Sequence, residues 1–261
     1  MPVSGVPWWV LVPVKDAGAA KSRLTHPQRG ELFTAMTADV LAVARAIVGA
    51  EHVHPVIDAG GGLDGDVRAA AAALSDRHAP VAVLMGDLPA VRPAELRDAL
   101  SAAAAHPQAV VADASGTGTA LLTARDATLL APAYGVGSFH RHVSAGAFAL
   151  ADLPLPGLRR DVDTPEELEA AVALGVGPAT AAVLGQRCGS TAASFDPDAG
   201  AGTARTDDGQ PITLPAGPLA AAGLRLLRPG QRLTTWVRDG AALAVRIGTA
   251  APAEAGREGG H

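Results

Sequence analysis

Hydrophobic residues in the first two-thirds of the chain alternate between short continuous runs and helical spacing. The apolar runs Trp8–Val14 and Val81–Met85 predict interior parallel strands, and Pro13 belongs at the end of the first because a central strand position needs its N–H. Apolar residues recur at helical spacing through Arg29–Val48, which predicts a long helix on the sheet. Strands that alternate with helices indicate an α/β layered sheet.

Weaker segments continue this alternation. Pro93 suits the first turn of a helix, and Thr164 followed by Pro165 and two glutamates predicts a capped helix start. We expect further strands at 52–57, 109–112, 119–123 and 148–152, helices at 67–74, 93–105, 138–146 and 164–174, and turns at Gly60–Asp66 and Asp113–Thr119.

The pattern changes after about Gly185. Short alternating segments run from Ser190 to Val245, with turn signals in Asp207-Asp208-Gly209 and Arg238-Asp239-Gly240. No helix longer than Pro218–Leu226 fits this segment. We therefore expect a first domain over 1–185, a small OB-like β-barrel over 190–249 and a disordered polar tail over 250–261.

Composition limits the classes of function. The chain has 261 residues, 48% of them hydrophobic, and a net charge of −5, which allows a sizeable core and argues against a general polyanion binder. Cys188 is the single cysteine, so an intrachain disulfide and a cysteine-based zinc site are excluded. The N-terminal apolar run ends at Lys15 without a basic n-region, so we expect no signal peptide, no membrane segment and a cytoplasmic protein.

The loop after the first strand carries three cations. Lys15, Lys21 and Arg23 lie at the carboxyl end of this strand, near a helix expected to start at about Ala19. Free N–H groups, the helix dipole and these cations would all favour a phosphate. A basic, solvated loop is the alternative, and the GxxxxGK[ST] pattern of a P-loop is absent from the sequence.

Carboxylates follow the second apolar run and precede the last helix of the first domain. Asp87 comes directly after a buried strand, where a carboxylate can hold Mg²⁺, although aspartate also forms turns before proline. Asp161 and Asp163 precede the helix that begins at Thr164, where capping is the simpler role. Because alternate residues of an extended segment point to opposite sides, we expect one of the two to face the site.

Two loops of small residues supply further hydrogen-bond donors. Ser115–Thr119 and Gly135–Ser138 could hold a second phosphate through N–H groups and hydroxyls, or could be turns without a ligand. His140 and His142 lie at i, i+2 on a helix, a poor spacing for one metal ion, and we interpret them as surface or packing residues.

Several motifs in order resemble one family. They are VPVKxxxxAKSRL, GGGL, MGDLPA, GTGTALL, YGVGSFHRH and DVDTPEEL, over roughly Val10–Leu174. Together they resemble the 2-phospho-L-lactate and phosphoenolpyruvate guanylyltransferases of deazaflavin coenzyme biosynthesis. The resemblance implies a glycosyltransferase-A-like, Rossmann-like nucleotidyltransferase sheet. It also implies attack by a three-carbon phospho-acid on the α-phosphorus of GTP, with Mg²⁺ bridging phosphates and pyrophosphate leaving.

The resemblance also implies roles for individual residues. Lys15, Lys21 and Arg23 would bind the triphosphate, with Lys21, Arg23 and Asp87 as the catalytic set, and Asp64 would contact guanine. Asp87 and Asp163 would bind the metal. Gly135 and Ser138 would bind the phospho-acid, with Thr119 in place of a hydroxyl that some members carry at the position of Ala120.

The chain departs from the family pattern in length. Relatives carry a further strand and helix between the first long helix and the GGGL loop, whereas about a dozen residues separate Ile47 from Gly60 here. A βα unit that would help to wall the nucleotide pocket is therefore missing. The protein could be a compact enzyme, an impaired one or an inactive one.

The C-terminal segment resembles a cold-shock-like OB barrel that lacks most base-stacking aromatics. Phe195 remains, while Ala201 and Thr203 occupy positions usual for phenylalanine. We expect a packing or dimerisation role for this segment and no nucleic-acid partner, and a homodimer stays open.

Two acceptor substrates are open, phosphoenolpyruvate and 2-phospho-L-lactate. We favour phosphoenolpyruvate only because the composition looks actinobacterial. The alternatives are a non-catalytic nucleotide- or RNA-binding regulator and a sugar-nucleotide enzyme of the same fold.

Overall fold

The computed structural model describes residues 7–14, 24 and 29–248 and divides into two compact units, Met1–Leu184 and Gly185–His261. The loop with Lys15, Lys21 and Arg23, the helix start at Ala19 and the tail 250–261 lie outside the described residues. Within those residues, no helix is long and apolar enough to cross a membrane.

The first unit contains a six-stranded mixed sheet in the order β2-β1-β3-β5-β4-β6. β5 runs antiparallel to both of its neighbours, β3 and β4, and the other pairs are parallel. The strands are β1 (Trp9–Val14), β2 (Val53–Ile57), β3 (Val81–Leu84), β4 (Gln108–Ala112), β5 (Thr119–Ala124) and β6 (Phe148–Ala149).

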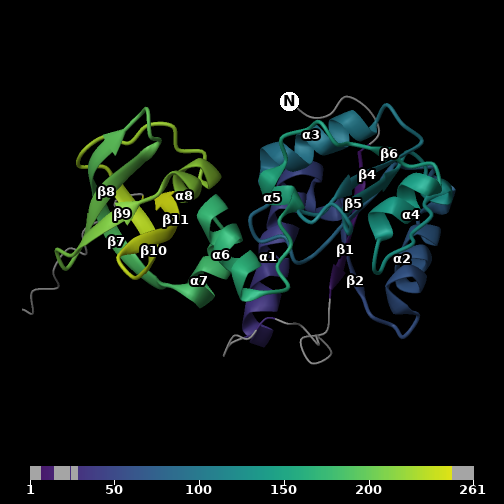
Figure 1. Ribbon diagram of the computed structural model, residues 1–261, viewed down its shortest axis with the longest axis horizontal. Helices are drawn as coiled ribbons and strands as arrows, with labels where there is room; N and C mark the ends of the chain where they lie inside the picture. The colour runs from purple at the N-terminus through teal and green to yellow at the C-terminus, as the bar shows by residue number, and fades with distance from the viewer. Residues whose placement is uncertain (1–6, 15–23, 25–28, 249–261) are drawn as a thin grey trace, which may run out of the picture. The chain divides into compact units, whose positions relative to one another are not determined.

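Helices cover both faces of this sheet (Figure 1). On one face, β1, β3 and β4 pack against α1 (Arg29–Val48), α3 (Pro93–Ala103) and α5 (Pro156–Arg159). On the other, Leu11, Val83 and Val110 pack with residues of α2 (Gly62–Ala72) and of the segment before α4 (Ser138–Ser144). Fully buried strands explain the continuous apolar runs in the sequence.

The sequence predicted most of these elements and misplaced some boundaries. The helix α1 has the predicted bounds, and Thr164 caps α6 (Pro165–Leu174) by accepting a hydrogen bond from the Glu167 amide. The segment Gly60–Asp66 is not only a turn: α2 begins inside it at Gly62, with Asp64 favouring the helix N-terminus. The helix α7 (Pro178–Leu184) was not predicted, and Asp39 of α1 fixes its start by accepting hydrogen bonds from the amides of Ala179 and Thr180.

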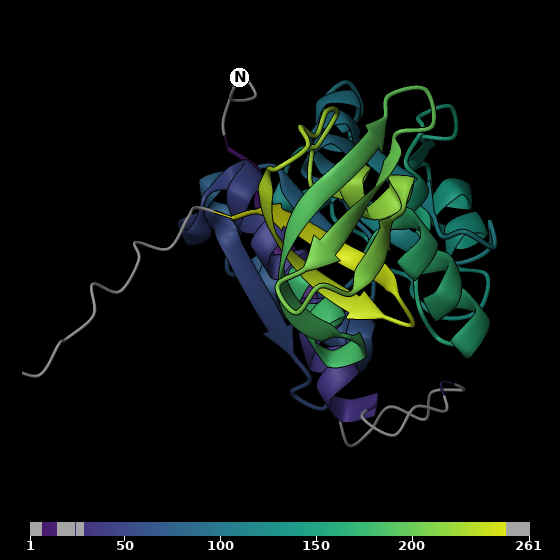
Figure 2. The same ribbon diagram turned by 90° about the vertical axis from the view of Figure 1, so that its left-hand side faces the viewer.

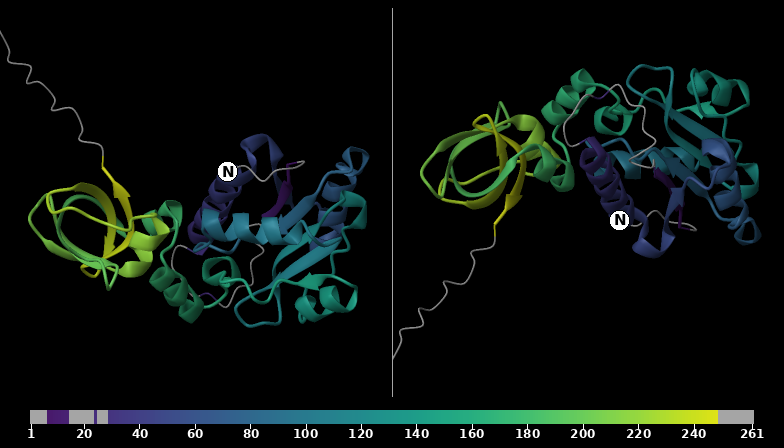
Figure 3. Two further views of the ribbon diagram at one scale, coloured as in Figure 1. Left: turned by 90° about the horizontal axis from the view of Figure 1, so that it is seen from above. Right: turned by 90° about the horizontal axis from the view of Figure 1, so that it is seen from below.

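The second unit is a closed five-stranded barrel in the order β10-β11-β9-β8-β7 (Figures 2 and 3). The strand β11 runs parallel to β9, the other pairs are antiparallel, and α8 (Ala216–Ala221) lies between β9 and β10. This is OB topology, as the sequence predicted. The strands are β7 (Gln186–Asp196), β8 (Ala201–Thr206), β9 (Pro211–Leu214), β10 (Arg232–Arg238) and β11 (Ala241–Ile247).

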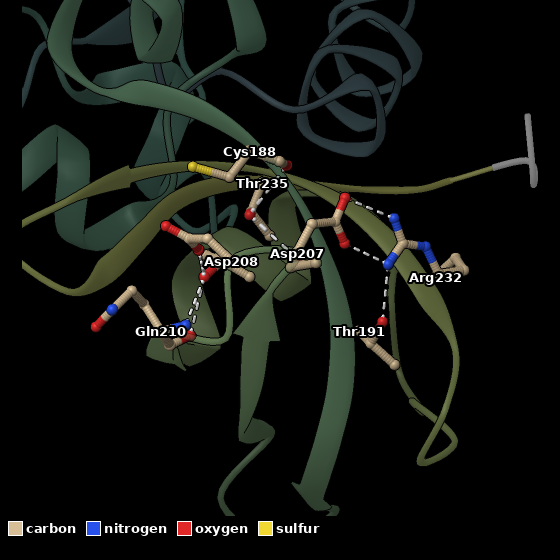
Figure 4. A network of polar contacts seen from close by, with 9 residues as sticks. Cys188, Thr191, Asp207, Asp208, Gln210, Arg232 and Thr235 are labelled. Carbon is tan, nitrogen blue, oxygen red and sulfur yellow. Dashed lines mark hydrogen bonds and ion pairs between the residues drawn. The ribbon is translucent and has the colours of Figure 1, made fainter.

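A polar cluster joins the strands where the barrel closes (Figure 4). Arg232 of β10 donates to both carboxylate oxygens of Asp207, one at 2.9 Å, and to the Thr191 hydroxyl of β7 at 2.9 Å. A Cβ at Gly189 would lie 2.2 Å from Asp207 Oδ2, so a larger residue there would displace this carboxylate. The barrel starts at Gln186, slightly before the expected Ser190, and α8 is shorter than the predicted helix.

Candidate active site at the carboxyl edge of the sheet

The predicted site residues gather at one edge of the sheet because of its strand directions. β1, β3 and β4 run parallel, so the residues that follow them emerge at the same edge, where ligands of open α/β sheets bind. β5 is antiparallel to them, so its first residue, Thr119, reaches this edge as well. Asp87 follows β3 and Asp113 follows β4.

Asp87 is fixed in the loop after β3. It is 7% exposed, and its backbone carbonyl accepts a hydrogen bond from the Val162 amide at 3.1 Å. Val162 is fully buried, so this bond holds the segment Asp161–Asp163 against the Asp87 loop. The structure therefore brings together the two segments whose carboxylates were predicted to bind a metal.

The carboxyl group of Asp161 is affected by the negative charge of Asp87. Burial, with the negative charges of Asp87 and Asp113 next in importance, raises the pKa of Asp161 to about 7. A cation between these carboxylates would relieve the repulsion. For Asp163, the backbone amide donates to Glu167 at 2.7 Å as part of the cap of α6. Its role as a metal ligand stays a prediction.

The residues present fit a magnesium ion that also binds substrate phosphates. Among the described residues, no three side chains of His, Cys, Asp or Glu are close enough to hold a metal by themselves. Mg²⁺ normally takes one or two carboxylates and completes its octahedron with water and phosphate oxygens. Asp87 with one of Asp161 and Asp163 matches that donor set.

Asp113 organises the DASGTGT loop. Its Oδ1 accepts hydrogen bonds from the Ser115 hydroxyl at 2.8 Å and the Thr117 amide at 3.1 Å, and its Oδ2 accepts one from the Gly118 amide at 2.9 Å. Gly118 must lack a side chain, because a Cβ would lie 2.2 Å from Asp113 Oδ2. Asp113 thus determines where β5 begins and where Thr119 lies.

The residues predicted to bind the phospho-acid form a buried hydrogen-bonded group. Ser138, at the start of α4, donates to the Thr119 hydroxyl at 3.0 Å. The same oxygen lies 3.0 Å from His142 Nδ1, and His142 Nε2 accepts from the Ala133 amide at 2.9 Å. Thr119, Ser138 and His142 are 7%, 2% and 1% exposed. The sequence interpretation of His142 as a surface or packing residue missed this polar contact, which only the position of β5 creates.

Arg141 holds the loop that contains Gly135. Its guanidinium donates to the carbonyls of Ala133 at 3.1 Å and Tyr134 at 2.8 Å, and to that of Val136. Gly135 has φ +109° and Gly137 has φ +72°, values that favour glycine. The loop brings Gly135 close to Ser138, whose amide donates to the Gly135 carbonyl at 3.0 Å.

An apolar cavity of about 140 Å³ opens at the carboxyl ends of β1, β2 and β3. Asp64 does not line it: its Oδ1 accepts a hydrogen bond from the Tyr134 amide at 2.8 Å, on the side of the phospho-acid group. Asp66, which the sequence did not single out, does line it. The lining residues are Pro13, Val14, Val56, Asp58, Leu63, Asp66 and Met85.

Comparison with known proteins identifies the family of the chain. The model of the family described as guanylyl transferase CofC-like matches residues 8–149. A Nocardia farcinica protein named phosphoenolpyruvate guanylyltransferase is 42% identical over 204 aligned positions, which cover 67% of this chain and 89% of that protein. A protein of the same name from Frankia casuarinae is 35% identical, with 87% of this chain and 94% of that protein covered.

The two alignments differ in how much of the chain they cover. About 175 residues of this chain (67% of 261) span 204 aligned positions with the Nocardia protein, so about 30 positions are gaps in this chain. The Frankia alignment covers about 227 residues (87% of 261), more than the 184 of the first unit, so it includes part of the barrel segment.

Likeness to solved structures is weaker. A putative nucleotide-diphospho-sugar transferase from Desulfovibrio desulfuricans G20 has a TM-score of 0.47 and 18% identity, over 62% of this chain and 84% of that one. The extent of the family match and the identity to the curated relatives are decisive. The chain belongs to the CofC-like guanylyl transferase family of nucleotidyltransferases.

Proposed function

We propose that the protein transfers the guanylyl group of GTP to phosphoenolpyruvate and releases pyrophosphate. The observation that carries this proposal is 42% identity to a protein named phosphoenolpyruvate guanylyltransferase over 89% of that protein's length. An oxygen of the acceptor phosphate forms a bond to the α-phosphorus of GTP, and the bond from that phosphorus to the β-phosphate oxygen breaks. The electron pair leaves with pyrophosphate, so no redox partner is needed.

The roles of the residues follow the geometry of the edge. Asp87 with Asp163 or Asp161 would hold Mg²⁺, which when bound neutralises phosphate charge. The buried pKa-shifted carboxyl of Asp161 supports its inclusion beside Asp163. Lys15, Lys21 and Arg23 follow β1 in the sequence, and we assign the triphosphate to them and catalysis to Lys21, Arg23 and Asp87.

The cavity at the ends of β1, β2 and β3 would receive the guanine base. Its apolar walls suit a planar ring, and Asp66 offers a carboxylate that can accept hydrogen bonds from N1–H and the N2 amine of guanine. Asp64 stays a predicted guanine ligand, but one of its oxygens already binds the Tyr134 amide. Asp66 is therefore a second candidate for base selection.

Thr119, Gly135 and Ser138 would bind the phospho-acid. Their convergence on one hydrogen-bonded group at the amino end of β5 supports this assignment. Magnesium, GTP, cytoplasmic location and a role in deazaflavin coenzyme biosynthesis belong to the same proposal.

The test is product formation by the purified full-length chain. Incubation with GTP and Mg²⁺ should release pyrophosphate in the presence of phosphoenolpyruvate and yield a product of the mass of the guanylyl adduct. Parallel reactions with 2-phospho-L-lactate, with ATP in place of GTP and without an acceptor test acceptor choice, base choice and background. GTP binding with no pyrophosphate released for either acid would contradict the proposal and favour a non-catalytic nucleotide-binding regulator.

A further inference from the structure

The hydrogen bonds of His142 determine its protonation state. Nε2 accepts from the Ala133 amide at 2.9 Å, so this nitrogen must carry a lone pair. The proton of the neutral ring therefore lies on Nδ1, which donates to the Thr119 hydroxyl 3.0 Å away. If Nε2 were protonated, its N–H would point at the N–H of Ala133, and the two hydrogens would repel each other.

This arrangement decides what the Thr119 hydroxyl can still do. It accepts one hydrogen bond from Ser138 and one from His142, which uses both of its lone pairs. The remaining interaction open to it is to donate its own hydrogen. A hydroxyl that can only donate a hydrogen bond binds an anionic oxygen of a ligand well, and it binds poorly to a ligand group that must itself donate. The Ser138 hydrogen, by contrast, is already given to Thr119.

We propose that His142 is a positioning residue of the phospho-acid site: its Nδ1–H orients the Thr119 hydroxyl to donate a hydrogen bond to the substrate's carboxylate or phosphate. This inference rests on the proposed function, because it takes Thr119 to contact the acceptor substrate. It refines the roles of the two hydroxyls in this site: Thr119 donates to the substrate, and Ser138 takes part by donating to Thr119.

The charges around His142 are compatible with a neutral ring. Burial lowers its pKa, Asp64 of α2 opposes that shift, and Arg141 of α4 reinforces it. Tyr134 also meets the ring edge-on at 5.3 Å between ring centres, and burial raises its own pKa. Below the lowered pKa of His142, the ring would gain a proton at Nε2 and lose the Ala133 bond.

Kinetics of three variants test the proposal. His142→Leu removes the donor and should raise KM for phosphoenolpyruvate roughly tenfold, the effect of losing one oriented hydrogen bond to a charged group, while KM for GTP changes less than about twofold. His142→Asn keeps an N–H near the Nδ1 position and should restore most of the affinity. His140→Asn, an exposed histidine of the same helix, is the matched control and should leave both constants unchanged.

A pH profile and a spectrum give readouts that a merely structural role would not move. As the pH is lowered, KM for phosphoenolpyruvate should rise more in wild type than in His142→Asn. The variant has no titrating ring at this position, so its pH profile shows the effect of the substrate's own ionisation alone. Nitrogen-15 NMR of the wild-type ring should show the neutral Nδ1–H tautomer at pH 7, and it needs no variant to fold.

The outcomes separate this inference from the proposed function. A protonated ring or the Nε2–H tautomer at pH 7 would overturn the inference, and so would equal changes of both KM values in His142→Leu. No product from wild type would overturn the proposed function, while the NMR measurement would still decide the hydrogen-bond arrangement.

Discussion

Asp161→Asn should stabilise the metal-free protein above neutral pH. The pKa of Asp161 is raised from its ordinary 3.8 to about 7 by burial and by the charges of Asp87 and Asp113. The folded state thus keeps a proton that the unfolded state releases between about pH 4 and pH 7. Stability must fall as pH rises through this window and then level off, because the unfolded chain binds fewer protons there. Asparagine cannot ionise, so the variant should not show this loss.

The magnitude follows from the same shift. Each pH unit between the two values is equivalent to about 1.4 kcal/mol, which gives about 4 kcal/mol for a fully desolvated group. Asp161 is only partly buried, and screening by solvent reduces this to about 1–2 kcal/mol. Urea denaturation without metal should therefore show the variant more stable than wild type by about this amount at pH 8 and equal at pH 4.

Magnesium and a control variant complete the experiment. Mg²⁺ should raise the melting temperature of wild type at pH 8 more than that of Asp161→Asn, because a cation compensates a charge that the variant lacks. Asp152→Asn changes an exposed carboxylate of the same unit and should leave the pH dependence as in wild type. Identical pH dependence in Asp161→Asn and wild type, or a less stable variant at pH 8, would refute the reasoning.

Four further predictions concern other parts of the chain. Asp87→Asn should fold normally and lose nearly all pyrophosphate release through loss of a metal ligand, and turnover at the wild-type rate would assign Asp87 to the turn alone. Glu95→Ala should cost about 3 kcal/mol in urea denaturation, because buried Glu95 accepts hydrogen bonds from the amides of Gly157 and Leu158, both at 2.9 Å. Glu95→Gln keeps one acceptor oxygen and should cost less, and equal losses would show that the retained hydrogen bond contributes nothing. A chain that ends at Gly185 should keep guanylyl transfer, since every predicted ligand precedes Leu174, and loss of activity in a folded truncated chain would show that the barrel segment is needed. Residues 190–249 should not bind a single-stranded oligonucleotide at physiological salt in a fluorescence titration, since Ala201 and Thr203 replace stacking aromatics; salt-resistant binding would contradict this.

The sequence by itself determined the layered α/β architecture and the barrel that follows it. Continuous apolar runs such as Val81–Leu84 reveal strands buried on both faces, and the Thr164 cap fixes a helix start, because both signals are local. The Asp239-Gly240 turn between β10 and β11 is also a local signal, because an Asp-Gly pair favours the positive φ that both residues adopt. Asp87 could be identified because it directly follows a buried strand.

Only the tertiary structure decided which side chains meet. Asp161 and Asp87 are far apart in the chain, and the Val162 bond that joins their segments has no sequence signal. The contact of His142 with Thr119 exists because the antiparallel β5 brings its first residue to the edge where α4 begins. Local pattern records whether a residue is buried, whereas hydrogen-bond partners depend on strand order and direction, which are set by long-range packing.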